Sequence, residues 1–200
     1  MGQRVVLVGD SVTDCGRDRE DDGSLGHGWV SVVGAELPDV TVINRGISGN
    51  RVRDLVARWD ADVLAAGPDT VGIMIGINDT WRRYDRDDAT STEAFAADYQ
   101  TLLDRTSAAG VGRVILLEPV LTPVSDPQWD WREDLDPKIS AVRRLAQRHG
   151  LELVPTDAVM NATAATRPLG ELAGDGVHPS EAGHRVIADA FLQAYRGRSS

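Results

Sequence analysis

RVVLVGDS at residues 4–11 joins a short apolar run, Arg4 to Val8, to a polar turn that begins at Gly9. The run is too short for a helix and rich in valine, which is typical of a strand buried on both faces. Four similar runs follow, each ending near Gly, Asn or Pro: Val40 to Asn44, Thr70 to Ile75, Arg113 to Leu117 and Leu151 to Val154. The sequence therefore predicts five strands.

Segments with helical spacing separate these runs. After the second run, apolar residues recur at intervals that place them on one helix face: Val52, Leu55, Val56, Trp59 and Val63. Thr90 and Glu93 form a capping-box pattern, which predicts a helix that extends to about Ala109. Two more helices are expected at 137–149 and from about residue 180 onward.

Alternating strands and helices predict right-handed βαβ units. We expect residues 1–200 to form a single three-layer α/β/α domain of the flavodoxin-like kind, with a five-stranded parallel sheet. Two long loops are expected, at 16–26 and 119–134. Ligands of such folds bind beyond the carboxyl ends of the strands, so the functional site is expected there.

Composition excludes several classes of function. The formal net charge is −10, and the 21 basic residues, all arginine except Lys138, are scattered among acidic ones, so nucleic acid is not an expected partner. Cys15 is the only cysteine, which excludes an internal disulfide and a cysteine-built zinc site. The first residues lack a signal-peptide core and no apolar run reaches about 18 residues, so we expect a cytoplasmic protein without membrane spans.

Three of the predicted strands end in small polar clusters. The first is followed by Asp10 and Ser11, whose hydroxyl and backbone N–H can face one opening. The second ends near Gly46, where a bare backbone N–H can approach a ligand, and the third ends near Asn78, whose amide can donate to an oxyanion. Each of these residues alone is equally explained by an ordinary turn or helix cap.

A fourth cluster, Asp175-Gly176-Val177-His178-Pro179, precedes the last predicted helix. Asp175 can hold one imidazole nitrogen of His178 and leave the other to face a hydroxyl. Alone, these two could be a turn residue and a surface histidine. Together, the four clusters supply a nucleophile, a base, an orienting carboxylate and oxyanion donors at one sheet edge.

At this point the chain resembles the SGNH hydrolases, also called the GDSL family. The resemblance covers positions 9–179 through the blocks GDS at 9–11, Gly46, GIND at 76–79 and DGVHP at 175–179. It implies that Ser11, His178 and Asp175 form a catalytic triad, with an oxyanion hole built from Ser11, Gly46 and Asn78. It implies an acyl-enzyme mechanism with no metal or cofactor.

Within that family the motif sequences are most similar to those of the intracellular acetylxylan esterases. The similarity is carried by GDSVTDCGR at 9–17, RGISGN at 45–50 and GINDTWR at 76–82. The resemblance implies a small ester substrate, an acetylated sugar or xylo-oligosaccharide first of all. Related enzymes often have a bulky residue before the catalytic Asp, whereas Gly174 stands here, so carboxylesters in general, lysophospholipids and thioesters stay open as substrates.

Five further residues are candidates for substrate binding: Asp10, Trp81, Arg82, Trp129 and Trp131. Indole faces suit pyranose rings, although loop aromatics also serve as core or as contacts of a homo-oligomer. We expect Asp10 and Asp79 to brace their loops by accepting backbone N–H bonds rather than to transfer protons.

The remaining histidines, at positions 27, 149 and 184, have no supporting neighbours in the sequence, and Cys15 is expected to be a small packed side chain.

Two rival functions are less consistent with the residues. A metal-dependent phosphoesterase needs several converging His and Asp ligands, and the first strand is followed by Asp10-Ser11 with no histidine nearby. A non-catalytic binding module, such as a signalling receiver, needs a lysine after the fifth strand, whereas Lys138 precedes it.

Overall fold

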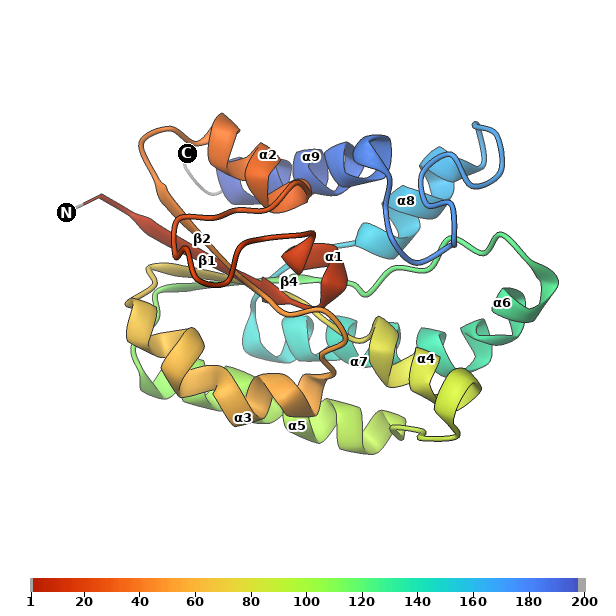
Figure 1. The fold of residues 1–200 in the computed structure, drawn as a ribbon. Helices are drawn as coiled ribbons and strands as arrows, with labels where there is room; N and C mark the ends of the chain where they lie inside the picture. Colours follow the sequence, from red (N-terminus) through yellow and green to blue (C-terminus); the bar gives the residue numbers. More distant parts are fainter. Residues whose placement is uncertain (1, 198–200) are drawn as a thin grey trace.

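Five parallel strands form one sheet in the order β2-β1-β3-β4-β5 (Figure 1). The computed structural model describes residues 2–197. The strands are β1 Arg4–Gly9, β2 Thr41–Gly46, β3 Thr70–Met74, β4 Arg113–Leu117 and β5 Glu152–Val154. The prediction of a five-stranded parallel sheet is confirmed, and each strand lies within two residues of its expected bounds.

Helices cover both faces of the sheet (Figure 1). They are α1 Ser11–Asp14, α2 Trp29–Glu36, α3 Val52–Asp62, the 3₁₀ turn η1 Leu64–Ala66, α4 Ile77–Arg86, α5 Thr92–Ala108, α6 Asp126–Asp130, α7 Arg132–His149, α8 Thr156–Ala164 and α9 Glu181–Gly197. In Figure 1, α2, α8 and α9 lie above the sheet, and α3, α5 and α7 lie below it. The three-layer α/β/α prediction is confirmed.

Successive side chains of β1 point to opposite faces of the sheet, and the core therefore has two layers. Val5 and Leu7 pack with Trp29 and Phe191 on the side of α2 and α9. Val6 and Val8 belong to the cluster on the side of α3 and α5. A strand with apolar residues on both faces needs a helix layer on each face, and β1 accordingly lies between the two layers, flanked in the sheet by β2 and β3.

Several helix boundaries differ from the sequence prediction. The cap of α5 is Ser91, whose side chain accepts from the Ala94 N–H, and not Thr90. The predicted loop 119–134 contains α6 and the start of α7, which begins at Arg132 and passes through Pro137. Helices α2, α4 and α8 were not predicted. Burial of Leu135 and Ile139, one turn apart, outweighs the helix-breaking tendency of the proline.

No helix within residues 2–197 combines the length and the apolar character that a membrane crossing requires.

Candidate active site

The nucleophile candidate, Ser11, is the first residue of the four-residue helix α1. β1 ends at Gly9, where a Cβ would overlap the Met74 carbonyl on β3, so only glycine fits. Asp10 then caps α1 by accepting the Val12 N–H at 3.0 Å. This sharp turn from strand to helix leaves the Ser11 side chain at the carboxyl edge of the sheet.

Ser11, His178 and Asp175 form one hydrogen-bonded chain. The distance from Ser11 Oγ to His178 Nε2 is 3.0 Å, and from His178 Nδ1 to Asp175 Oδ2 it is 2.6 Å. The carboxylate accepts from Nδ1–H, so Nε2 presents its lone pair to the serine hydroxyl. The structure thus brings together the three residues that the sequence singled out.

The Asp175 carboxylate is held by its own loop. Its Oδ1 accepts the backbone N–H groups of Val177 at 2.9 Å and His178 at 2.7 Å. Burial raises the pKa of Asp175, but the hydrogen bonds from His178 and Val177 outweigh it, and the pKa lies below its ordinary value. Asp175 is therefore ionised and oriented at neutral pH.

Gly46 is not placed to donate into this site, and its prediction as an oxyanion donor is wrong. Its backbone N–H donates to the side-chain oxygen of Asn44 at 2.8 Å, and a Cβ at this position would overlap the backbone nitrogen of Asp14. β2 packs so closely against α1 at this point that only glycine fits at position 46. The need for glycine here is therefore steric.

Gly49, in the same turn, has the properties expected of Gly46. It is exposed, its φ of +83° lies in the left-handed region, and a Cβ there would meet open space. Within residues 2–197 its backbone N–H has no hydrogen-bond acceptor, and the same is true of the Ser11 N–H. Sequence reasoning chose the glycine next to the strand and missed the second one.

Asn78 lies in the first turn of α4 and faces this turn. Its Nδ2 donates to the Asn50 carbonyl at 3.1 Å, which leaves its second N–H for a ligand. Its Oδ1 accepts from Arg82 Nη2 at 3.1 Å, and Arg82 also pairs with Asp85. Arg82 thus supports Asn78, and its expected contact with substrate stays a prediction.

Asp10 and Asp79 are buried braces. Asp79 Oδ2 accepts the Val52 N–H at 3.1 Å, as Asp10 accepts that of Val12, so the bracing role is confirmed. Burial raises the pKa of each carboxyl to about 7. Asp10 is 2% exposed, and the prediction that it contacts substrate is wrong.

A comparison with known families identifies the chain. Residues 7–186 match the model of the GDSL-like lipase/acylhydrolase family. The chain belongs to this family. The predicted class, a carboxylic ester hydrolase, is thereby confirmed.

Relatives of known sequence or structure agree with this membership. An acetylxylan esterase from Geobacillus stearothermophilus is 40% identical, covering 96% of this chain and 93% of its own length. The solved structure of LAE5, an alpha/beta hydrolase from the metagenome of Lake Arreo in Spain, has a TM-score of 0.90 at 38% identity and covers 96% and 94% of the two chains.

Axe2, an acetylxylan esterase from Geobacillus stearothermophilus, has a TM-score of 0.88 at 38% identity, with the same coverage as LAE5. Solved catalytic mutants of Axe2 replace a serine, an aspartate or a histidine by alanine. The aspartate and histidine of Axe2 are three positions apart, the spacing of Asp175 and His178 in this GDSL-family protein.

Of the three predicted tryptophans of the GDSL-family protein, Trp81 lies beside the triad and Trp131 packs against Trp81. The Trp81 ring is 5.9 Å from the His178 ring and 5.6 Å from that of Trp131, measured between centroids. Tyr84, which sequence reasoning missed, stacks on Trp131 at 5.4 Å. Trp81, Tyr84 and Trp131 form an aromatic cluster, with the Trp81 ring nearest to the base.

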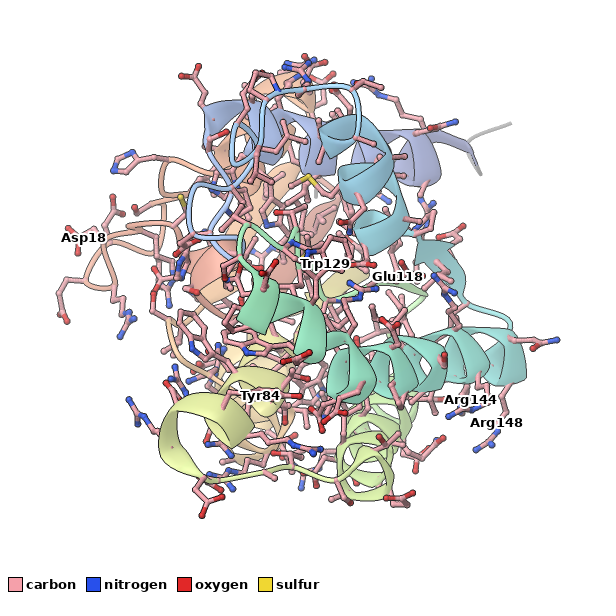
Figure 2. All side chains as sticks on the ribbon, turned by 90° about the vertical axis from the view of Figure 1, so that its right-hand side faces the viewer. Asp18, Tyr84, Glu118, Trp129, Arg144 and Arg148 are labelled. Carbon is pink, nitrogen blue, oxygen red and sulfur yellow. The ribbon has the colours of Figure 1, made fainter. Side chains whose placement is uncertain are left out.

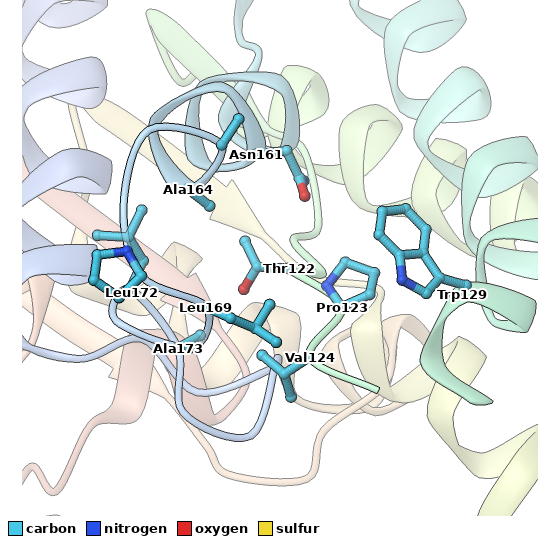
Figure 3. A pocket seen from close by; sticks show the side chains of 12 residues that line it. Thr122, Pro123, Val124, Trp129, Asn161, Ala164, Leu169, Leu172 and Ala173 are labelled. Atoms are coloured by element: carbon cyan, nitrogen blue, oxygen red, sulfur yellow. The ribbon is translucent and has the colours of Figure 1, made fainter. Parts of the chain in front are cut away.

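Trp129 lies elsewhere. It is 60% exposed on α6 and, with Leu169, lines an apolar cavity of about 330 Å³ between α8 and the loop that precedes Asp175 (Figures 2 and 3). Gly174 adjoins this loop, and a Cβ there would meet open space. Within residues 2–197 no ring-to-ring contact joins Trp129 to the aromatic cluster, and a role of Trp129 in substrate binding stays a prediction.

Proposed function

We propose that this protein is a serine esterase that removes short acyl groups, acetyl foremost, from xylo-oligosaccharides and other sugar esters. The observation that carries the chemistry is the chain of hydrogen bonds from Ser11 through His178 to Asp175. The 40% identity to an acetylxylan esterase supports the substrate class.

In the first step, Ser11 Oγ attacks the ester carbonyl while His178 Nε2 takes the hydroxyl proton. The new bond joins Oγ to the carbonyl carbon, and the C=O electron pair moves to oxygen. Asp175 stabilises the imidazolium, because its ionised carboxylate accepts the Nδ1–H bond. His178 then gives its proton to the alcohol oxygen as that bond breaks, leaving an acylated serine.

We assign stabilisation of the oxyanion to three N–H groups. They belong to the backbone of Ser11, the backbone of Gly49 and the side chain of Asn78, each with a hydrogen not used by another group within residues 2–197. Donors fixed in advance stabilise the charge that develops in the transition state. Gly49 takes the role first given to Gly46.

In the second step, water attacks the acyl carbon and His178 again accepts the proton. The tetrahedral adduct collapses, the serine oxygen regains a proton from His178, and the acid leaves. Every proton moves through one imidazole nitrogen, so the mechanism uses only residues of this chain.

The Trp81 ring supports sugar binding. It lies 5.9 Å from the catalytic imidazole and is partly exposed, so an indole face is available next to the position of the leaving alcohol. Sugar rings present C–H groups that pack on such faces.

The test compares initial rates on peracetylated xylose, a long-chain nitrophenyl ester and an acyl-thioester, with Ser11→Ala as the control. We expect the highest kcat/KM on the acetylated sugar and no activity above background for Ser11→Ala. A preference for the long-chain ester or the thioester would overturn the sugar assignment. Failure of a fluorophosphonate to label Ser11 would overturn the esterase mechanism and favour a binding module.

An intracellular location and assembly into a homo-oligomer stay predictions from the sequence.

A further inference from the structure

His184 connects the two segments that carry the reactive pair. It lies near the start of α9, six residues after His178, and its backbone N–H donates to the Ser180 carbonyl at 2.8 Å. Its side chain is 5% exposed and points to α1, the helix that begins with Ser11. His184 lies on the last helix, as expected, and its neighbours come from segments far away in the sequence.

The hydrogen bonds of His184 fix its tautomer. The backbone N–H of Trp29, at the start of α2, donates to His184 Nδ1 at 3.2 Å. Nδ1 is therefore an acceptor without a proton, and in the neutral ring Nε2 carries the proton. Nε2 lies 3.2 Å from the sulfur of Cys15, so its N–H donates to Sγ.

Cys15 ends the helix that Ser11 begins. Its backbone N–H donates to the Ser11 carbonyl at 2.9 Å, and its φ of +36° closes the turn. This bond couples the two residues directly, so we expect displacement of Cys15 to displace Ser11. The pair is also closely packed, because a Cβ on Gly28 would lie 2.7 Å from Cys15 Cβ and 2.8 Å from His184 Cε1.

We propose that Cys15 and His184 are positioning residues that set the separation of Ser11 and His178. Cys15 closes α1, the helix that begins with the nucleophile Ser11. His184 lies in α9, the helix that follows the base His178. The inference rests on the proposed function, because it concerns the same Ser11–His178 pair. Errors of about 1 Å in such geometry cost about 10²-fold in rate.

The electrostatics of His184 suit this role. Burial lowers its pKa to about 4, and the nearby His178 acts in the same direction. His184 therefore stays neutral when His178 takes the serine proton and adds no positive charge against the imidazolium.

The test uses variants that remove or restore one contact. Cys15→Ala removes the acceptor with little change in volume, and Cys15→Ser keeps an acceptor. His184→Asn keeps an oxygen near the Trp29 N–H but is too short to reach Cys15, whereas His184→Gln places an amide N–H near the position of Nε2. His149→Asn is the matched control, since the His149 ring bonds to Gln100 at the exposed end of α7.

The readouts are kcat divided by the number of sites that fluorophosphonate labels, KM, and the rate constant of the labelling reaction. We expect labelling and kcat to fall about tenfold in Cys15→Ala and up to about 100-fold in His184→Asn, with KM within about twofold. Cys15→Ser and His184→Gln should recover most of the loss, and His149→Asn should match the wild type. A merely structural role would reduce the number of labelled sites and not the rate at each one.

The proposal would be overturned by one result. This is a Cys15→Ala protein that is folded by circular dichroism and whose Ser11 is labelled at the wild-type rate, regardless of the result for His184→Asn. Absence of labelling in the wild type would instead overturn the proposed function, so the two failures are distinguishable.

Discussion

Arg82 Nη2 donates to the side-chain oxygen of Asn78 from one turn further along α4, at 3.1 Å. This bond distinguishes the two ends of the Asn78 amide, because the guanidinium cannot accept a hydrogen bond. The NH₂ end must then face Asn50 and the Gly49 turn. A residue first assigned to substrate thus orients an oxyanion donor.

Removing this donor or its support should reduce turnover. Asn78→Ala is expected to lower kcat by about 10²- to 10³-fold. Arg82→Ala should lower kcat by less, about tenfold, because the amide stays but loses its orientation. Steady-state kinetics check both, and Arg83→Ala is the matched control, because Arg83 pairs with Glu133 and Asp134 instead. Equal activity of Arg82→Ala and Arg83→Ala would contradict the supporting role.

The two glycines of the β2–α3 turn should respond differently to alanine. Gly46→Ala places a Cβ onto the Asp14 backbone, so we expect loss of folded protein on expression. Gly49→Ala meets open space and pays only for its left-handed φ, about 1–2 kcal/mol of unfolding free energy. Chemical denaturation measures this difference. A stable Gly46→Ala protein with full activity would contradict the steric requirement at Gly46.

Stability should depend on pH through Asp10 and Asp79. Burial raises the pKa of each to about 7, whereas an unfolded aspartate titrates near 3.8. Between these values the native state holds a proton that the unfolded state has lost. The unfolding free energy therefore falls as pH rises from about 4 to 7, by about 1.4 kcal/mol per pH unit for each group.

Asp79→Asn should halve this slope, because the side-chain oxygen of the amide accepts the Val52 N–H without titrating while Asp10 still titrates. Urea denaturation at intervals from pH 4 to 8 measures it, with Asp60→Asn on the exposed face of α3 as control. Parallel pH curves for wild type and Asp79→Asn would contradict a protonated Asp79.

Alanine substitutions of Trp81 and Trp129 should differ in their effect on KM. Trp81→Ala is expected to raise KM on acetylated xylo-oligosaccharides about tenfold, equivalent to about 1.4 kcal/mol of binding. Trp129→Ala should leave KM unchanged, because Trp129 lies on the cavity between α8 and the loop before Asp175. A larger effect at Trp129 than at Trp81 would place the sugar in that cavity.

The sequence predicted the strands and the triad for identifiable reasons. The apolar runs that end near Gly, Asn or Pro are too short for helices, so they predict strands. Asp175 and His178 are three residues apart, close enough to form a hydrogen bond within one loop. The 3.0 Å contact of Ser11 with His178 spans the fold, and it followed from the rule that strand ends of a parallel sheet share an edge.

Other parts of the site depend on information that the sequence does not contain. Trp129 and Trp131 were expected in one loop, but they lie at the α6–α7 junction, where residues two apart point to different sides. Gly46 and Gly49 stand in the same turn, and they are separated by the bond from Gly46 to Asn44 and by the space around each glycine, neither of which the sequence reveals. The partners of His184 lie on α1 and α2, so no local spacing reveals them.

His178 and Asp175 are each about half-exposed, at 46% and 52%. A reaction centre so near the surface admits an acyl group carried on an oligosaccharide of any length, since the remainder of the chain can stay in water. The same accessibility leaves the aspartate–imidazole bond exposed to dissolved ions, so ionic strength acts directly on the charged intermediate.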